Sequence, residues 1–267
     1  HLVSSLVRIW WIQISRSQAQ TSRVCKNGLS SSSSRRGSAA ISMGVQKFSR
    51  FLHEKYGDGP CRETLRAGTR VLIDGSGFIF RAFHSSPLDA FKRSDGVHTN
   101  AVNGYVNMLL KLIDRAHDDG ALDYMAVIFD AARKNFRNDI YPEYKANRDE
   151  PPEELRPQFQ LVRDATEAFG LPAIAKEGFE ADDLIATYAR AAEAQGIETV
   201  VVSSDKDLMQ LVRDGVFMLD PMKDIVIGED EVMDKFGVTP DKVIDVQSLA
   251  GDSTDNVPGV PGIGVKT

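Results

Sequence analysis

Nine acidic residues stand at positions where carboxylates could act together. Three of them end apolar runs that favour β-strands, and the other six lie in short acidic motifs. The strand-ending acids are Asp74 in "RVLID", Asp130 in "YMAVIFD" and Asp205 in "ETVVVSSD", and the others are Glu180, Asp182, Asp183, Asp207, Asp252 and Asp255. One Asp after a strand is common turn chemistry, and acids at a helix start complement the helix dipole. Three such strands beside an acidic helix start nevertheless favour a shared site.

Nine carboxylates that converge would repel one another strongly at neutral pH, and they cannot all stay ionised without compensating charge. Divalent cations supply that compensation. Oxygen ligands without a matching set of His or Cys select Mg²⁺ or Mn²⁺ over zinc. Two such ions about 4 Å apart activate water and stabilise the leaving oxygen of a phosphodiester. The pattern therefore predicts metal-dependent phosphoryl hydrolysis.

Strand and helix patterns alternate around these acids. The strands are separated by helical stripes of apolar residues at 101–116, from 154 onward and at 178–192. This alternation predicts an α/β fold with a central, mostly parallel sheet flanked by helices. Right-handed crossovers place the strand ends at one edge, where open α/β sheets bind ligands.

The helix at 178–192, "GFEADDLIATYARAA", sets the directions of three acids. On an ideal helix, Glu180 and Asp183 lie about 60° apart at one border of the apolar arc, so we expect them to share a metal site. Asp182 falls beyond the other border. It is expected at an irregular helix start, or to act through water.

A second motif interleaves basic and aromatic side chains. It spans residues 131–150, "AARKNFRNDIYPEYKANRDE", and its members are Arg133, Lys134, Phe136, Arg137, Tyr141, Tyr144, Lys145 and Arg148. Cations can follow a phosphate backbone while rings stack on bases, a combination suited to single-stranded nucleic acid. A solvated loop is the alternative.

Composition narrows the class of protein. The chain has 267 residues, 42% hydrophobic and 26% charged, which is ordinary for a globular protein. Eight Lys or Arg and no acid precede residue 54, so the remaining 214 residues carry 24 basic against 38 acidic side chains. This excess of acidic side chains argues against a protein that simply binds polyanions. Cys25 and Cys61 make neither a disulfide framework nor a zinc site, and a reducing compartment is expected.

Both ends of the sequence carry distinctive segments. Residues 1–42 are Ser-rich with Arg but no acid, which is typical of an organellar transit peptide; alternatively they are untranslated sequence and Met43 is the start. Residues 43–68 are predicted to form an extension with an amphipathic helix. No run reaches the roughly 18 apolar residues of a membrane span. At the other end, the glycines of "NVPGVPGIGVKT" permit a tight hairpin whose amides can face phosphate.

Together these segments resemble a known family. In order, "VLIDGSGFIFRAFH", "VIFDAARKNFRNDIYPEYKANRDEPP", "GFEADDLIAT", "VVVSSDKDLMQLV" and "LAGDSTDNVPGVPGIGVKT" are similar to the 5′-to-3′ exonuclease domain of bacterial DNA polymerase I, within the flap endonuclease family. The resemblance covers about residues 69 to 267. It implies a PIN-like 5′ nuclease fold with a helical arch at 131–152 and the start of a helix-hairpin-helix module.

The resemblance also implies roles for particular residues in a structure-selective nuclease that removes 5′ flaps and RNA primers during primer removal and DNA repair. All nine acids match ligands of two or more Mg²⁺ or Mn²⁺ ions. Tyr144, Lys145 and Arg148 match catalytic arch residues, whose ring stacks near the scissile nucleotide and whose cations steady the phosphate. DNA contacts are implied for Arg81, Arg133, Lys134, Phe136, Arg137, Tyr141, Gly259, Gly262, Gly264 and Lys266. The hairpin "GVPGIGVKT" holds K⁺ in relatives, which makes K⁺ a second candidate ion.

Two alternatives stay open. "MGVQKFSRFLHEKYG" is similar to the opening of eukaryotic 5′-to-3′ exoribonucleases, and a truncated duplex module would suit a non-catalytic binder of DNA junctions. The expected organisation is a leader (1–42), the extension (43–68), the 5′ nuclease domain (69–245) and a truncated helix-hairpin-helix module (246–267). A monomer is expected, in a mitochondrion or plastid if 1–42 is a transit peptide and otherwise in the cytoplasm or nucleoid.

Overall fold

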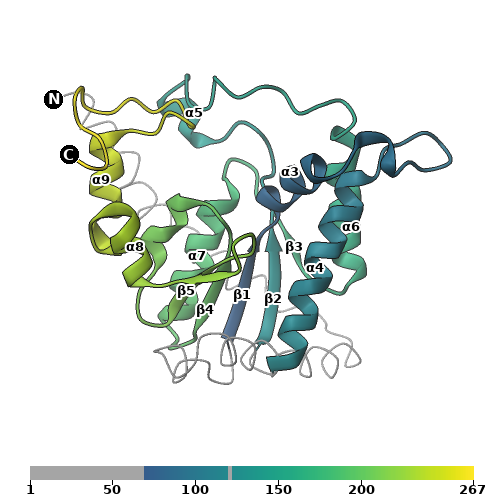
Figure 1. Ribbon diagram of the computed structural model, residues 1–267, viewed down its shortest axis with the longest axis horizontal. Coiled ribbons are helices and arrows are strands. Elements are labelled where there is room, and N and C mark those ends of the chain that lie inside the picture. Colours follow the sequence, from purple (N-terminus) through teal and green to yellow (C-terminus); the bar gives the residue numbers. More distant parts are fainter. Residues whose placement is uncertain (1–68, 120–121) are drawn as a thin grey trace.

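One six-stranded sheet forms the centre of the residues that the structure describes, which are 69–119 and 122–267 (Figure 1). In this computed structural model the strands are β1 (Thr69–Asp74), β2 (Leu122–Ile128), β3 (Ala173–Ile174), β4 (Thr199–Val202), β5 (Val216–Asp220) and β6 (Ile225–Ile227). The predicted leader at 1–42 and extension at 43–68, with its helix, lie outside the described residues.

The strand order is β3-β2-β1-β4-β5-β6, and only β6 runs antiparallel to its neighbour. The chain passes from β1 outward to β2 and β3, and then returns to the other side of β1 with β4. The order therefore reverses between β1 and β4, and the carboxyl ends of these two strands border the crevice where such sheets bind ligands.

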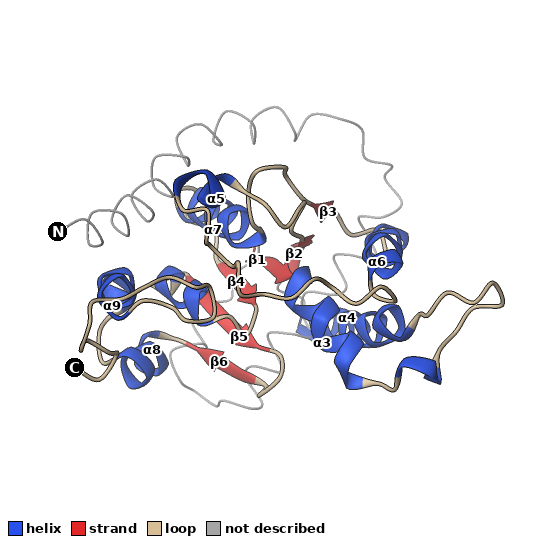
Figure 2. Cartoon of the chain, turned by 90° about the horizontal axis from the view of Figure 1, so that it is seen from above, coloured by secondary structure: helices blue, strands red, loops and turns tan. Residues whose placement is uncertain are grey.

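Helices cover both faces of the sheet, as the view from above shows (Figure 2). The helices on one face are α3 (Gly75–Ser85), α4 (Asn100–Asp119) and α6 (Arg156–Ala168). On the other face lie α7 (Ala181–Glu193), the 3₁₀ turns η3 (Lys206–Leu211) and η4 (Pro240–Lys242), α8 (Glu229–Phe236) and α9 (Val243–Ala250). The short α5 (Phe136–Ile140) and the 3₁₀ turn η2 (Leu88–Ala90) complete the described elements.

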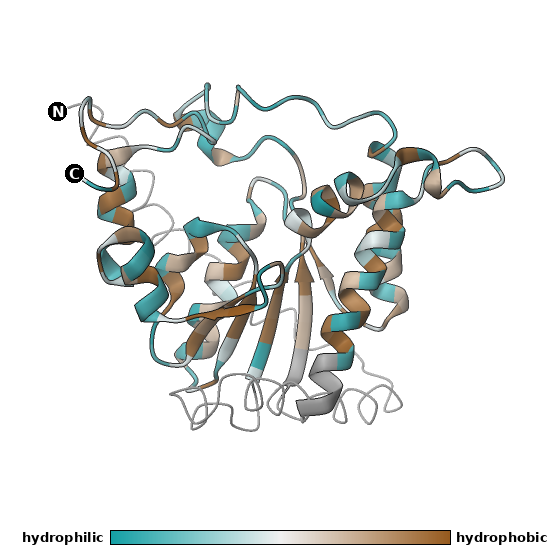
Figure 3. Ribbon diagram, in the orientation of Figure 1, coloured by the Kyte–Doolittle hydropathy of each residue, from teal (hydrophilic) through white to brown (hydrophobic). Residues whose placement is uncertain are grey.

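Alternation along the strands sorts their side chains between two cores. Val71 and Ile73 of β1 pack with the α3, α4 and α6 side, whereas Leu72 packs with α7. Because both faces are buried, the strands are mostly apolar, and in Figure 3 the largely brown strands lie beneath a mainly hydrophilic segment that crosses the carboxyl edge. Within the described ranges no helix combines the length and apolar composition needed to cross a bilayer.

The predicted mostly parallel α/β architecture is confirmed. Strand β2 ends two residues before Asp130 and β4 ends three residues before Asp205, so both acids lie in the loops beyond the sheet. The sequence patterns did not predict α3, because the glycines at 75 and 77 interrupt its apolar stripe. They also missed β3, β5, β6, α8 and α9, which are short elements of two to eight residues.

Candidate active site

Asp74 occupies the point where the strand order reverses. Its Oδ1 accepts a hydrogen bond from the Gly77 amide at 3.0 Å and caps α3, and its Oδ2 accepts one from the Ser203 hydroxyl at 2.9 Å. Burial, together with repulsion from Asp130 and Asp205, raises the pKa of Asp74 from 3.8 to about 6. Two hydrogen bonds thus hold a carboxylate whose charge is poorly compensated.

Three further acids face Asp74 from separate elements, and with it they form what we call the central cluster: Asp74, Asp130, Asp182 and Asp205. Asp130 is exposed, and its Oδ1 accepts the Ala181 amide at 2.8 Å at the start of α7. Burial, with repulsion from Asp205 and Asp74, raises the pKa of Asp182 well above its ordinary value. Asp182 lies on the first turn of a regular helix, so the predicted irregular start is wrong.

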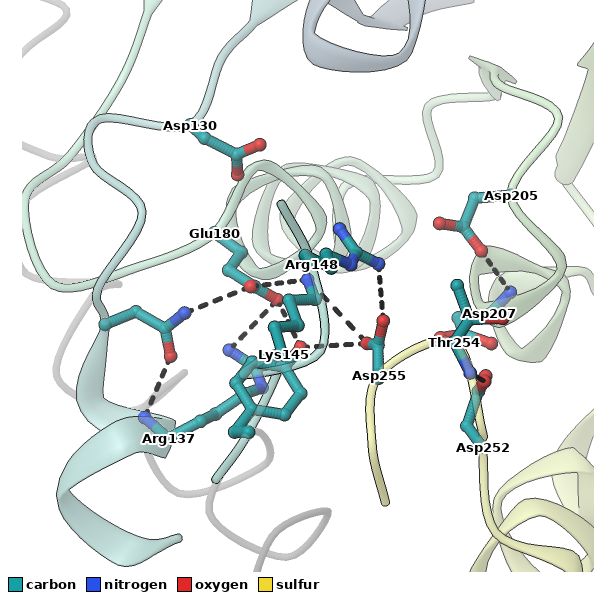
Figure 4. A network of polar contacts seen from close by, with 12 residues as sticks. Asp130, Arg137, Lys145, Arg148, Glu180, Asp205, Asp207, Asp252, Thr254 and Asp255 are labelled. Carbon is teal, nitrogen blue, oxygen red and sulfur yellow. Dashed lines mark hydrogen bonds and ion pairs between the residues drawn. The ribbon is translucent and has the colours of Figure 1, made fainter. Parts of the chain in front are cut away.

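Asp207 and Asp252 lie next to Asp205 and form the border of the central cluster (Figure 4). The carboxylate of Asp205 accepts the Asp207 amide at 2.9 Å. Burial and the neighbouring Asp205 raise the pKa of Asp207 to about 6. Although burial opposes ionisation of Asp252, the ion pair with Lys206 at 2.7 Å holds its pKa below the usual range. Lys206 therefore compensates the charge of Asp252 at the border of the central cluster.

Glu180 and Asp255 make a second acidic group, which is compensated by the arch segment, residues 131–152. The Tyr144 hydroxyl lies 2.9 Å from Glu180 Oε2 and 3.0 Å from Asp255 Oδ2. Lys145 Nζ lies 2.6 Å from Glu180 Oε1 and 3.7 Å from Asp255 Oδ2, and the Arg148 guanidinium pairs with Asp255 (Figure 4). The predicted catalytic arch cations thus contact two of the predicted metal ligands.

Electrostatics separate the two groups. Burial disfavours the charge on Glu180, but Lys145 and Arg137 lower its pKa below the usual value. The pKa of Tyr144 is raised by burial and by the Glu180 charge, so its hydroxyl stays protonated and donates. Glu180 is therefore ionised and neutralised, whereas the raised pKa values of Asp74 and Asp182 show that the charges of the central cluster are only partly compensated.

Arg137 and Asp183 form a buried pair next to Glu180. The guanidinium donates to both Asp183 oxygens at 2.7 and 2.8 Å, and Arg137 is only 2% exposed. The prediction that Arg137 contacts DNA is wrong for this reason. Asp183 also accepts the Glu180 amide at 2.9 Å, so its carboxylate faces Arg137 and not the central cluster. The expectation that Glu180 and Asp183 share a metal site is replaced by a shared contact with Arg137.

The remaining residues that were predicted to act in the arch or to contact DNA differ in how exposed they are. Tyr144 is 3% exposed, so its ring is not available for base stacking in this conformation. Arg133 pairs with Glu150 at 2.8 Å. Gly259 packs against the end of α9, where an added Cβ would collide with the Ala250 oxygen. On the surface, wholly or in part, lie Arg81, Lys134, Phe136, Tyr141, Gly262, Gly264 and Lys266.

Neither implied helical feature is fully helical in the described residues. The arch segment contains only the five residues of α5, followed by turns around Pro142 and Pro151. Helix α9 ends at Ala250, and residues 251–267 form turns with one bridge between Asp252 and Val257. The predicted module at 246–267 therefore begins as a helix and continues as a loop.

Several polar residues of the site were not predicted. Ser203 supports Asp74, Lys206 pairs with Asp252, and Gln247 donates to the Asp207 carboxylate. Asn135 caps α5 and donates to Glu180 Oε1 at 3.0 Å. The spacing Asn135 to Asn138, a capping box, was the one signal in the sequence for such a role.

The donor chemistry of the central cluster fits a hard divalent cation, because it offers only carboxylate oxygens. The raised pKa values of Asp74 and Asp182 show that their negative charges need a compensating partner. Among the described residues, no three Asp, Glu, His or Cys side chains are already drawn around one point closely enough to hold an ion. An entering cation would thus have to draw the carboxylates inward.

Comparison with known proteins places this site in a family. The model described as "5′-3′ exonuclease, N-terminal resolvase-like domain" matches residues 69–237. DNA polymerase I of Rhizobium leguminosarum is 59% identical over 199 residues, and that of Bacillus subtilis is 41% identical over 201 residues. These matches cover 73% and 74% of the chain but only 20% and 22% of the relatives, so the chain spans about a fifth of their length.

Solved structures share the fold. A bacteriophage T5 5′-exonuclease with bound zinc ions superposes with a TM-score of 0.60 at 26% identity, and the match covers 74% of this chain and 72% of that one. A T5 flap endonuclease in a complex with DNA and metal ions gives a TM-score of 0.59 at 25% identity with the same coverage.

Proposed function

Because the chain belongs to the 5′-3′ exonuclease family with an N-terminal resolvase-like domain, we propose that it hydrolyses DNA phosphodiesters at 5′ ends and 5′ flaps with Mg²⁺ or Mn²⁺. The observation that carries the proposal is the central cluster at the reversal of strand order. Asp74 and Asp182 have raised pKa values there because they are buried beside further carboxylates. Such a cluster stores repulsion that a divalent cation relieves.

The acids of the site would hold the ions, and Ser203 would keep one of these acids in place. Asp74, Asp130, Asp182 and Asp205 would hold the cations at the centre, with Asp207 and Asp252 at the border. Bound divalent ions supply the activation of water and the stabilisation of the leaving oxygen. Ser203 keeps the Asp74 carboxylate in place through its 2.9 Å hydrogen bond, so the cluster is partly oriented before any ion arrives.

The arch cations would act on the substrate. Lys145 and Arg148 are held at the acidic site by their ion pairs with Glu180 and Asp255. A scissile phosphate that competes for them would receive two cations at the site of reaction. We infer that the substrate is DNA with a 5′ flap or a single-stranded 5′ end, and that RNA primers at the 5′ ends of DNA strands are also removed. We propose a role in primer removal and repair, and the similarity to DNA polymerase I relatives supports this proposal.

A double substitution tests the proposal. Asp205→Asn with Asp207→Asn should abolish Mg²⁺-dependent cleavage of a 5′-labelled flap, because it removes two carboxylates of the cluster and its border. The matched control is Asp214→Asn with Asp234→Asn, two exposed acids outside the site, which should cleave as the wild type does. Full activity in the Asp205/Asp207 variant would refute the assignment.

Substrate comparison separates the alternatives. An exoribonuclease would cleave a matched RNA flap faster than the DNA flap, and the segment that favours this reading lies outside the described residues. A non-catalytic junction binder would retain the flap at every Mg²⁺ concentration without turnover. Cleavage of the DNA flap in preference to RNA would exclude both.

A further inference from the structure

The Arg137 side chain is buried and contacts the acidic start of α7. It belongs to α5, at the base of the arch segment, and its side chain is only 3% exposed. Phe136 lies against it, with the guanidinium carbon 4.6 Å from the ring centroid, and Tyr144 flanks it at 6.0 Å. A guanidinium enclosed in this way cannot reach a phosphate outside the protein.

The carboxylate that satisfies Arg137 connects it to the start of α7. Asp183 accepts two parallel hydrogen bonds from the guanidinium, which is the strong bidentate geometry. The same carboxylate accepts the Glu180 amide at 2.9 Å, while Glu180 Oε2 lies 3.7 Å from Arg137 Nη1. One arginine thereby fixes both the backbone and the side chain at the first residue of the acidic motif.

Backbone contacts join the same two segments. Asn135 forms a bridge with Gly178, and the Phe136 amide donates to the Gly178 carbonyl at 3.1 Å. The Asn135 side chain donates to Glu180 at 3.0 Å, and the Phe136 and Phe179 rings pack at 5.8 Å. The base of the arch and the start of α7 therefore form one packed unit around the buried ion pair.

We propose that Arg137 is a positioning residue: by pairing with Asp183 it anchors the arch to the start of α7 and sets the direction of Asp182 toward the central cluster. Asp183 then serves as the anchor of Arg137 and not as a ligand of the divalent ion. This inference rests on the proposed function, because it assigns Asp182 as the acid of this turn that meets the ion. The inference gives different roles to Asp182 and Asp183, two adjacent acids that the sequence alone does not distinguish.

Mn²⁺ binding to the full chain, measured by electron paramagnetic resonance without DNA, tests the proposal. Arg137→Met should weaken Mn²⁺ binding about 10- to 100-fold, as loss of a residue that orients metal ligands does. Asp183→Asn should weaken it to a similar extent, and the double variant should be no worse than either single one, because both residues act through one contact. Arg137→Lys should recover part of the affinity, because it keeps the charge but loses the bidentate fork.

Two outcomes would overturn it. If Asp183 is a ligand that Arg137 merely competes for, Arg137→Met will bind Mn²⁺ more tightly than the wild type. If Arg137 contacts DNA, Arg137→Met will leave Mn²⁺ binding unchanged and reduce the salt dependence of DNA binding by about one phosphate contact. Arg93→Met, which breaks the exposed pair with Asp95, is the matched control and should change neither quantity.

A second variant distinguishes a loss of folding from a loss of Mn²⁺ binding. If Arg137→Met leaves the buried Asp183 carboxylate without a cation and fails to fold, the pair Arg137→Met with Asp183→Leu removes both charges and restores folding. That pair should still bind Mn²⁺ more weakly than the wild type, and undiminished binding would refute the positioning role. A wild-type chain that binds Mn²⁺ yet leaves every DNA flap intact would refute the proposed function alone.

Discussion

Replacement of Asp74 by Asn should stabilise the metal-free protein at alkaline pH while it removes activity. Burial raises the pKa of Asp74 from 3.8 to about 6. Each unit of pKa difference between the unfolded and the native state corresponds to about 1.4 kcal/mol of stability. The ionised carboxylate therefore costs the native state about 3 kcal/mol above pH 7. Asn removes that charge and still caps a helix as well as Asp does.

The hydrogen bonds reduce the gain. The introduced amide would keep one acceptor for Gly77 or Ser203 and rearrange the other contact, at a cost of about 1 kcal/mol. The net stabilisation of Asp74→Asn is then about 2 kcal/mol at pH 8, or a rise of about 4–8 °C in Tm for a domain of this size. Because the native state binds more protons than the unfolded state between pH 3.8 and 6, the wild type regains stability as the pH falls through this window.

Urea denaturation in EDTA at pH 8 and at pH 4.5 measures the effect. The gain should be near zero at pH 4.5, where Asp74 is protonated in the native wild type. Asp95→Asn, at an exposed site, should stay within about 0.5 kcal/mol of the wild type at both pH values. A destabilised Asp74→Asn protein at pH 8, or a difference that does not change with pH, would show that the burial argument is wrong.

Three other outcomes follow from the site. Mg²⁺ at about a hundred times its Kd should stabilise the wild type by about 2.7 kcal/mol in a thermal melt; no shift at millimolar Mg²⁺ would contradict ion binding at the central cluster. Tyr144→Phe should lower the free energy of unfolding by about 1–3 kcal/mol, because Glu180 and Asp255 lose a buried donor; a neutral result by urea denaturation would rule this out. Gly259→Ala should unfold at a lower urea concentration than Gly264→Ala, because its Cβ would collide with the Ala250 oxygen whereas a Cβ at Gly264 would meet open space; equal midpoints would argue against the contact.

The sheet and its acidic edge could be predicted because strands carry their own signal. Apolar β-branched runs that end in Asp identified β1, β2 and β4, and the parallel alternation placed Asp74, Asp130 and Asp205 at one edge. The short elements could not be found in this way, because a strand of two residues such as β3 has no period to detect.

Composition could not predict which side chains of the basic and aromatic segment at 131–150 are buried and which are exposed. Arg137 and Lys134 look equivalent in the sequence, yet one is buried and the other exposed. The difference comes from Asp183, which lies 46 residues away along the chain. A capping box from Glu180 to Asp183 explains why Asp183 turns back toward the helix start, and that spacing was visible in the sequence.

The contacts of Lys145 and Arg148 with Glu180 and Asp255 carry a thermodynamic consequence. These cations cannot pair with the acids and with a phosphate at the same time. We expect a divalent ion bound at the central cluster to weaken the hold of Glu180 and Asp255 on the cations, and we expect DNA that takes the cations to leave these two acids uncompensated and so to strengthen the attraction of the site for the ion. Each ligand would then raise the affinity for the other by the same factor, even without direct contact between them.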